Sequence, residues 1–313
     1  MNQRTKQRTN QRIFVTGATG YIGSAVAARL VKQGHQVFGL TRSRENAKAL
    51  AAMGVSPVLG DVAGDDDWSG ALQNCDAAVH CAFDSENGAA DVDQAALEAI
   101  RHAALDGRVR RVLYTSGIWV HGHGVDGQAD ESTPLAPLDI VQWRAAHEEI
   151  ALDLSAHEVD VVILRPGMVY GEQRGILGGW FAEAHESHTV TYPGVGSQHW
   201  SLVHRDDLAD AYALALEHAD GGERFLLADE SHHTVKELAE AVAAATKSKA
   251  TSWSAEELVR SHGGYGEALL NDLSVTSAKA RRVLGWVPRH TSFVAEAPEL
   301  WRDWQAARVS PVR

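Results

Sequence analysis

The chain has 313 residues, of which 44% are hydrophobic and 22% are charged, so it can bury a sizeable core. Its 41 acidic and 29 basic residues give a net charge of −12, which argues against nucleic acid or an anionic membrane as a partner. Two cysteines provide no disulfide framework and suggest a reducing, cytoplasmic location, and no apolar run approaches the roughly 20 residues of a membrane span.

The first twelve residues are expected to form a flexible basic tail. Arg4, Lys6, Arg8 and Arg12 are its only charged residues, and it lacks the apolar core of a secretory signal. We therefore leave this segment out of the predicted fold.

A glycine-rich loop follows the tail. An apolar run at residues 13–15 leads into Gly17, Gly20 and Gly23, and an amphipathic stretch covers residues 24–33. This order predicts a strand, a phosphate-binding loop and a helix. One glycine makes the tight turn, one lets a pyrophosphate approach the backbone, and one lets the helix pack close to the strand. The loop therefore predicts a bound dinucleotide.

Strands and helices alternate through the next 130 residues. Apolar runs predict strands at residues 36–41, 55–59, 77–82, 111–115 and 159–164, and helical spacing predicts helices at residues 45–53, 92–105 and 141–154. Asp65, Asp66 and Asp67 are expected to cap the start of a further helix. The alternation predicts an α/β fold with a doubly wound parallel sheet of the Rossmann type.

Beyond residue 171 the alternation is lost. The sequence predicts helices near residues 180–185, 206–217 and 235–245 and strands near residues 189–196 and 224–227. We assign residues 13–170 and about 200–230 to the dinucleotide-binding domain. Residues 171–199 and about 231–308 are assigned to a smaller α+β cap that binds the substrate.

Several motifs together resemble the extended short-chain dehydrogenase/reductase superfamily, of the NAD(P)-dependent epimerase/dehydratase type. They lie at residues 16–23, 60–62, 114–116, 164–171, 203–209 and 284–288. The resemblance implies a small-molecule substrate. It also implies a possible homodimer that forms through the helices at residues 92–105 and 141–154.

The resemblance also implies the residues of the cofactor site. Those expected to contact the cofactor are Gly17, Thr19, Gly20, Tyr21, Ile22, Gly23, Asp61, Val62, Cys81, Ala82, Phe83, Thr115, Pro166, Gly167 and Met168.

The residues after the second strand indicate which dinucleotide binds. NAD-binding proteins place an acidic residue there to bind the adenosine ribose, whereas this chain has Thr41, Arg42 and Ser43. An arginine can pair with a 2′-phosphate, and a serine hydroxyl can donate to it. We therefore expect NADP, with NAD the less favoured alternative.

The superfamily's usual catalytic residues are missing. The chain contains no Tyr-x-x-x-Lys. If the helix is aligned on Glu148, Ile140 takes the tyrosine position and Arg144 the lysine position, whereas alignment on Glu149 gives Val141 and Ala145. Alignment of the preceding loop puts Gly117 at the serine position, so neither register supplies the usual proton donor.

Other residues could take over the proton transfer. Ser116 ends the fifth strand, His121 follows in a glycine-rich loop, and Tyr170 follows the sixth strand. The alternatives are a surface histidine at position 121 and a packing tyrosine at position 170. Arg144 could hold the nicotinamide ribose, but its pKa is too high for a proton shuttle.

No metal site is expected, because the histidine clusters have no neighbouring cysteines and His-Glu-x-x-His is absent. Three hypotheses for the function remain. The first is an atypical NAD(P)-dependent oxidoreductase that acts on a small carbonyl, alcohol or activated alkene. The second is a redox-neutral epimerase, isomerase or lyase with a bound nucleotide. The third is a non-catalytic sensor that binds NADP.

Overall fold

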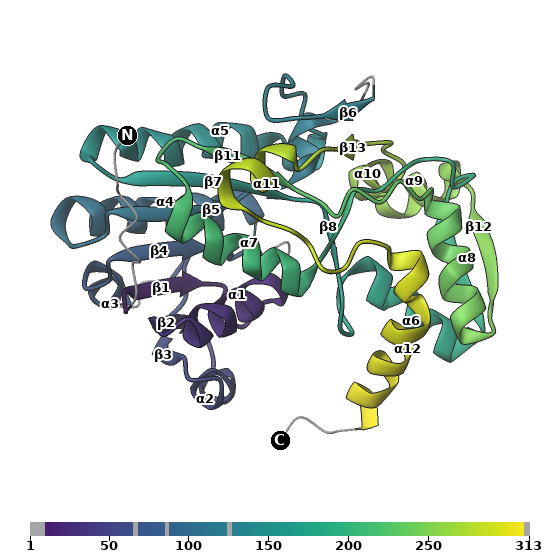
Figure 1. Cartoon of the computed structure of the whole chain (residues 1–313), viewed down its shortest axis with the longest axis horizontal. Helices are drawn as coiled ribbons and strands as arrows, with labels where there is room; N and C mark the ends of the chain where they lie inside the picture. The colour runs from purple at the N-terminus through teal and green to yellow at the C-terminus, as the bar shows by residue number, and fades with distance from the viewer. Residues whose placement is uncertain (1–9, 65–67, 85–87, 124–126, 310–313) are drawn as a thin grey trace.

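A computed structural model describes residues 10–64, 68–84, 88–123 and 127–309. Residues 1–9 of the expected tail and the expected helix cap at residues 65–67 lie outside this part. Figure 1 shows a parallel sheet flanked by helices, with a second group of helices and short strands beyond the end of the sheet.

The central sheet has seven parallel strands in the order β11-β7-β5-β4-β1-β2-β3. They are β1 (Arg12–Thr16), β2 (Gln36–Thr41), β3 (Ser56–Leu59), β4 (Ala77–His80), β5 (Arg111–Thr115), β7 (Asp160–Pro166) and β11 (Arg224–Leu227). The strand order reverses beside β1, which pairs with β2 on one side and β4 on the other. The crevice beyond the carboxyl ends of the strands at this point is where such sheets bind ligands. The predicted Rossmann-type sheet is confirmed.

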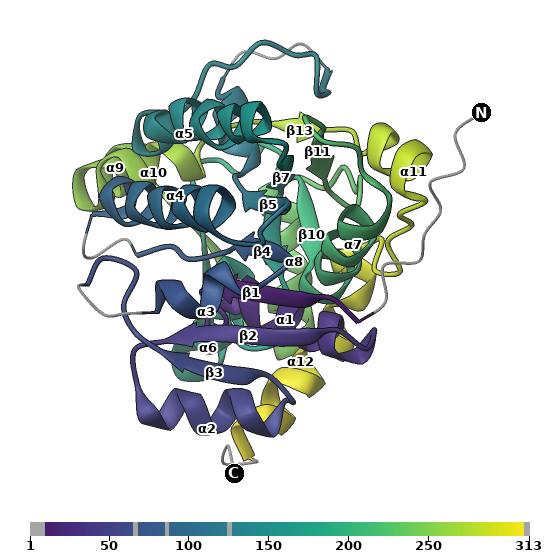
Figure 2. The same cartoon turned by 90° about the vertical axis from the view of Figure 1, so that its left-hand side faces the viewer.

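Helices cover both faces of the sheet. They are α1 (Tyr21–Lys32), α2 (Arg44–Ala52), α7 (Arg205–His218) and α11 (Ala278–Leu284) on one face, and α3 (Ser69–Gln73), α4 (Ala89–Asp106) and α5 (Gln142–Leu152) on the other. Figure 2 shows α4 and α5 on the opposite side of the sheet from α7. The side chains of β1 alternate accordingly, because Ile13 and Val15 pack with α1 and α7, whereas Phe14 packs with α3 and α4.

The remaining elements build the cap and the loops around the crevice. They are β6 (Gln128–Ala129), β8 (Met168–Tyr170), α6 (Gly175–Ser187), β9 (Thr189–Pro193), β10 (Leu202–His204), α8 (Val235–Thr246), β12 (Lys249–Trp253), α9 (Ala255–His262), α10 (Gly264–Leu269), β13 (Ser274–Val275) and α12 (Phe293–Val309). The described residues also form 3-10 turns: η1 (Ile118–His121) lies between β5 and β6, and η2 (Asp139–Val141) and η3 (Asp153–His157) flank α5.

The cap has its own core, in which Trp180, Phe181, Leu238 and Phe293 are buried. Its strands β9 and β12 pair in parallel. Within the predicted cap range, α11 instead packs on the sheet beside α7 and β11. The domain boundaries otherwise stay a prediction. Among the described residues, no helix is both long and apolar enough to cross a membrane.

Candidate active site

The glycine loop between β1 and α1 is tightly packed against its neighbours. Gly17 has a positive φ of 67°, and a Cβ atom there would lie 2.7 Å from the backbone of Cys81 and Ala82. A Cβ atom on Gly23 would lie 2.1 Å from the carbonyl oxygen of Gly17. Gly20 donates its N–H to the same oxygen at 2.8 Å. The loop therefore requires glycine at positions 17 and 23.

The N-terminus of α1 is open to an anion. Its N-cap is Gly20, which provides no side-chain hydrogen bond, and the first turn contains no acidic residue. Arg205 braces this turn, because its guanidinium donates to the Tyr21 carbonyl at 2.7 Å and the Ser24 hydroxyl at 2.8 Å. Tyr21 in turn donates its hydroxyl to the Gly171 carbonyl at 2.5 Å. The loop and the helix end thus fit the pyrophosphate of a dinucleotide.

The predicted adenosine end contains an ion pair. Arg42 after β2 donates to Asp84 after β4 at 3.0 Å. Ser43 caps α2 by accepting the Asn46 N–H at 3.1 Å, and Thr41 is buried. Arg42 is 62% exposed and its partner 17%. A 2′-phosphate would therefore compete with the Asp84 carboxylate for the Arg42 guanidinium.

The other residues of the predicted adenosine end lie in the turn after β3. Asp61 accepts the Ala63 N–H through its side chain at 3.2 Å, and its carbonyl accepts the Trp68 indole N–H at 2.8 Å. Val62 packs against the core that contains Trp68. This turn is thus held in place by Trp68 at the start of α3.

The carboxyl ends of β4 and β5 are joined by side chains. The Thr115 hydroxyl contacts the Cys81 sulfur at 3.4 Å and the Tyr212 hydroxyl at 2.7 Å. Burial raises the pKa of Cys81 to about 11, so this thiol stays protonated at neutral pH. The Thr115 carbonyl accepts a hydrogen bond from Arg144 at 3.1 Å, and the Arg144 guanidinium lies 5.3 Å from the Phe83 ring centre. The structure therefore brings together four residues of the predicted site, which are Cys81, Phe83, Thr115 and Arg144.

The nicotinamide side was predicted to contain Pro166, Gly167 and Met168. Pro166 ends β7 beside Leu227, and Gly167 donates its N–H to the Leu227 carbonyl at 2.9 Å. A Cβ atom on Gly167 would lie 2.4 Å from the Ser201 carbonyl oxygen, so this position also requires glycine. Met168 begins β8 and is partly exposed. This segment crosses from the sheet to the cap.

The two glutamates on which α5 can be aligned differ in their surroundings. Glu148 is fully buried and pairs with Arg165 of β7, with Oε1 and Nε 2.9 Å apart. Glu149 is 63% exposed and pairs with Arg224 at 2.8 Å. Arg144, which takes the lysine position in the alignment on Glu148, lies at the end of β5, where it donates to the Thr115 carbonyl. One turn earlier, Ile140 lies against Gly264 of α10.

The predicted proton donors differ in their surroundings. Ser116 is 5% exposed, and within the described ranges its hydroxyl has no hydrogen-bond partner. His121 is fully buried, so the alternative of a surface histidine is wrong. Its Nε2 lies 3.2 Å from Arg165, and burial lowers its pKa to about 4, which leaves it neutral at pH 7. Tyr170 is also fully buried, with its pKa raised by burial, and packs against His204 and Phe293.

A buried polar network connects the glycine loop to α5. Asp93 of α4 accepts from His80 at 2.9 Å, Tyr114 at 2.8 Å and His147 at 2.8 Å, and His80 contacts the Thr16 hydroxyl at 2.7 Å. Burial alone would raise the pKa of Asp93, but these hydrogen bonds lower it below its ordinary value.

This network was not predicted from the sequence. The sequence does contain one sign of it, because Asp93 stands one turn before Leu97 on the apolar stripe of the helix predicted at residues 92–105. A buried carboxylate requires hydrogen-bond partners, so its position on this stripe indicated polar residues opposite.

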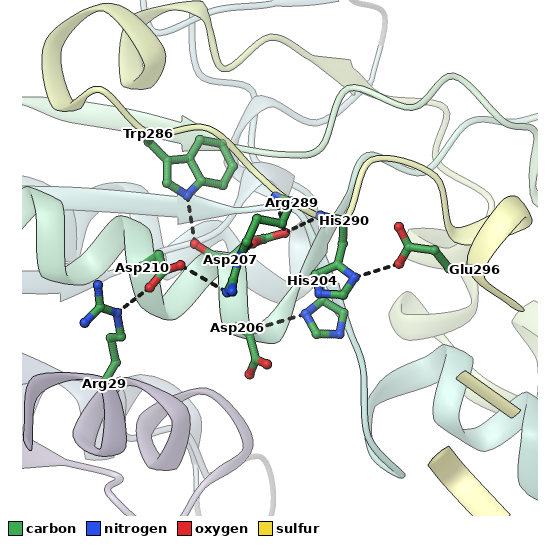
Figure 3. Close-up of polar contacts among 9 residues, drawn as sticks. All are labelled: Arg29, His204, Asp206, Asp207, Asp210, Trp286, Arg289, His290 and Glu296. Atoms are coloured by element: carbon green, nitrogen blue, oxygen red, sulfur yellow. Dashed lines mark hydrogen bonds and ion pairs between the residues drawn. The ribbon is translucent and has the colours of Figure 1, made fainter. Parts of the chain in front are cut away.

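A second polar cluster ties α7 to the segment that leads into α12 (Figure 3). Asp207 accepts the backbone N–H groups of Arg289 at 3.0 Å and His290 at 2.8 Å. His290 stacks on His204, with ring centres 3.6 Å apart, and contacts Glu296 at 2.7 Å. Ligand atoms of His204, Asp207 and His290 lie within 4.8 Å of one another.

This arrangement is better suited to holding α7 and the segment before α12 together than to binding a metal ion. Stacked imidazole rings hold their nitrogen lone pairs roughly parallel, so these cannot converge on one ion at about 2.0–2.1 Å. Asp207 already accepts the backbone N–H groups of Arg289 and His290. The cluster therefore fixes the cap relative to α7.

Residues 13–228 match the model of a family described as the NAD dependent epimerase/dehydratase family. The chain belongs to this family. It is 31% identical over 292 residues to the uncharacterized protein C2A9.02 of Schizosaccharomyces pombe, with 91% of this chain and 97% of that protein covered. It is 27% identical over 227 residues to a 4-hydroxy-2-methyl-3-oxo-4-farnesyl-3,4-dihydroquinoline-1-oxide ketoreductase of Stigmatella aurantiaca, with 70% of this chain and 68% of that protein covered. Curated relatives thus include enzymes.

A solved structure has the same fold. MoeE5 in complex with UDP-glucose and NAD has a TM-score of 0.80 and 22% identity, and the match covers 96% of this chain and 100% of that one. The likeness extends through the cap as well as the sheet. The fold expected from the motifs is therefore confirmed.

Proposed function

We propose that the protein is an atypical NADP-dependent oxidoreductase that acts on a small organic carbonyl, alcohol or activated alkene. The observation that carries this proposal is the glycine loop, in which Gly17 and Gly23 admit no side chain and α1 begins without a side-chain cap. Such a loop is suited to a dinucleotide pyrophosphate. The bound nicotinamide would supply or accept a hydride.

The preference for NADP rests on Arg42. This residue stands where NAD-binding proteins place a carboxylate, and its guanidinium can bind a 2′-phosphate. Asp84 limits the preference, because it pairs with Arg42 at 3.0 Å. We therefore propose a moderate preference for NADP over NAD.

The residues at the end of β5 favour a substrate whose reduction needs only a weak acid. Reduction of a ketone gives an alkoxide, which requires a strong proton donor in the site, whereas reduction of an activated alkene gives a less basic enolate. When hydride adds to the β-carbon, the alkene π pair forms a double bond between the α-carbon and the carbonyl carbon, and the carbonyl π pair moves to oxygen. Water can then protonate the α-carbon. Arg144 and Ser116 could donate hydrogen bonds to that oxygen without losing a proton.

Several relatives support a redox role by their names. They include the ketoreductase of Stigmatella aurantiaca, a sterol-4-alpha-carboxylate 3-dehydrogenase of Dictyostelium discoideum and a 2-alkyl-3-oxoalkanoate reductase of Shewanella oneidensis. The second candidate is a nucleotide-binding sensor. It is favoured by the burial of His121 and Tyr170, which leaves few accessible acids.

The test is a titration of the purified protein with NADPH and NADH, followed by a panel of ketones and enones under the tighter cofactor. Micromolar NADPH binding with oxidation on any member of the panel supports the oxidoreductase. Tight binding without oxidation supports the sensor, and product without net oxidation supports a redox-neutral enzyme. Binding of neither nucleotide contradicts all three.

A further inference from the structure

A cation without an anionic partner lies at the end of β5. Arg42, Arg165 and Arg205 each contact a carboxylate. For Arg144, by contrast, the described part of the chain offers no carboxylate within 4.0 Å. Its guanidinium is held by the Thr115 carbonyl at 3.1 Å and by aromatic faces. In a protein with a net charge of −12, a partly buried guanidinium without a counter-ion is suited to bind an anionic ligand.

The guanidinium is oriented before any ligand binds. Its carbon atom lies 4.5 Å from the ring centre of Trp143 and 5.3 Å from that of Phe83. These two contacts and one hydrogen bond restrain its plane while leaving most of its N–H donors for another partner. A planar arginine fork matches a carboxylate through two parallel hydrogen bonds.

The surroundings of Arg144 are apolar. Phe83 is 59% exposed, and Trp143 is partly exposed. Ile140 and Trp119 both pack against the small apolar cluster of Leu138, Val141 and Ala268. Ser116 adds a polar side chain at this strand end, and its hydroxyl has no partner in the described ranges. Strand alternation puts Ser116 on the face that carries Tyr114, which is the face that α5 covers.

We propose that Arg144 binds a carboxylate group of the substrate, so that the substrates are small carboxylic acids with an apolar body. This inference rests on the proposed function, since it places the substrate beside the nicotinamide in the same crevice. Arg144 then selects the substrate, in place of the proton relay that a lysine at this position supports in the superfamily.

The test compares cinnamate with methyl cinnamate as probes, because the two share an apolar ring and differ in charge. Binding of each to the NADP-saturated full-length protein is measured by calorimetry. We expect cinnamate to bind roughly ten- to a hundredfold more tightly than the ester, as charge-assisted hydrogen bonds of this kind imply. Arg144→Met should remove this preference, and Arg144→Lys should retain part of it.

Controls separate this inference from the proposed function. Arg101→Met, at an exposed position of α4, should keep the preference for cinnamate. Equal binding of acid and ester to the unmodified protein, or binding of neither, overturns the inference while NADP binding still stands. A parallel loss of NADP affinity in Arg144→Met also overturns it, because Arg144 would then hold the cofactor. Failure of the unmodified protein to bind NADP contradicts the proposed function itself.

Discussion

The glycine loop after β1 and the first turns of α5 lie at the same end of one sheet, but they differ in how far they keep the superfamily pattern. The loop keeps its three glycines, and Gly23 packs against Gly17 so closely that no side chain fits. In the alignment on Glu148, Ile140 of η2 and Arg144 of α5 stand where the superfamily has its tyrosine and lysine. Packing against a fixed backbone constrains the loop. By contrast, Arg144 donates to the Thr115 carbonyl at the end of β5, and Ile140 packs against the cluster of Leu138, Val141 and Ala268.

The helix that carries the altered residues is itself firmly anchored, and this gives the largest expected effect. Glu148→Gln should destabilise the protein by about 3–5 kcal/mol, because it leaves the Arg165 guanidinium buried without a counter-charge. Urea unfolding followed by circular dichroism measures this change. Glu149→Gln is the matched control and should cost less than about 1 kcal/mol, since that pair is exposed. Equal effects of the two substitutions would contradict the burial of the pair between Glu148 and Arg165.

The glycine loop should respond in its ligand affinity. In Gly23→Ala the added Cβ would approach the Gly17 oxygen to 2.1 Å, so the loop must shift. We expect NADPH affinity to fall roughly ten- to a hundredfold in a fluorescence titration. Gly179→Ala is the control, because nothing lies within 4 Å of its added Cβ. Unchanged affinity in Gly23→Ala would show that the nucleotide binds elsewhere.

The parallel sheet and the position of the glycine loop could be predicted from the sequence. The glycine spacing and the apolar strands predicted the sheet and its nucleotide site, because both depend on local patterns. The ion pair of Arg165, the ion pair of Arg42 and the network around Asp93 join residues that lie 13 to 54 positions apart. Such contacts depend on strand order and helix packing, which no local pattern specifies. Strand β12 was missed because it is mostly exposed and polar.

Substitutions at the predicted adenosine end should have a smaller effect, which is specific to one cofactor. Arg42→Ala should weaken NADPH binding about tenfold and leave NADH binding nearly unchanged, because only NADPH carries the 2′-phosphate. Asp84→Asn should strengthen NADPH binding by a few-fold, since it removes the competing carboxylate. Parallel titrations with the two cofactors measure both changes. An equal loss for NADPH and NADH in Arg42→Ala would contradict the preference for NADP.

The smallest effect concerns pH. Burial lowers the pKa of His121 to about 4, against an ordinary value near 6.5, so the unfolded chain binds more protons between these values. Stability should therefore fall as the pH decreases, by less than about 1 kcal/mol between pH 7 and pH 6 from this residue. Burial likewise lowers the pKa of His204 to about 4, while Asp229, with its pKa raised to about 6 by burial, acts in the opposite sense.

His121→Gln should flatten this dependence in urea unfolding at the two pH values. His123→Gln, at an exposed position two residues later, is the control and should leave it as it is. The same slope in all three proteins would contradict the burial of a neutral imidazole at position 121.

In this protein a glycine loop suited to a dinucleotide stands beside a site without the superfamily's usual tyrosine. The most direct test of this arrangement is NADPH oxidation by the unmodified protein with an enone and with the matching saturated ketone, at equal concentrations and pH 7. We expect the enone to be reduced at least about tenfold faster, because its enolate requires only a weak acid. Reduction of the ketone at an equal or higher rate would contradict it, since that rate requires a strong proton donor in the site.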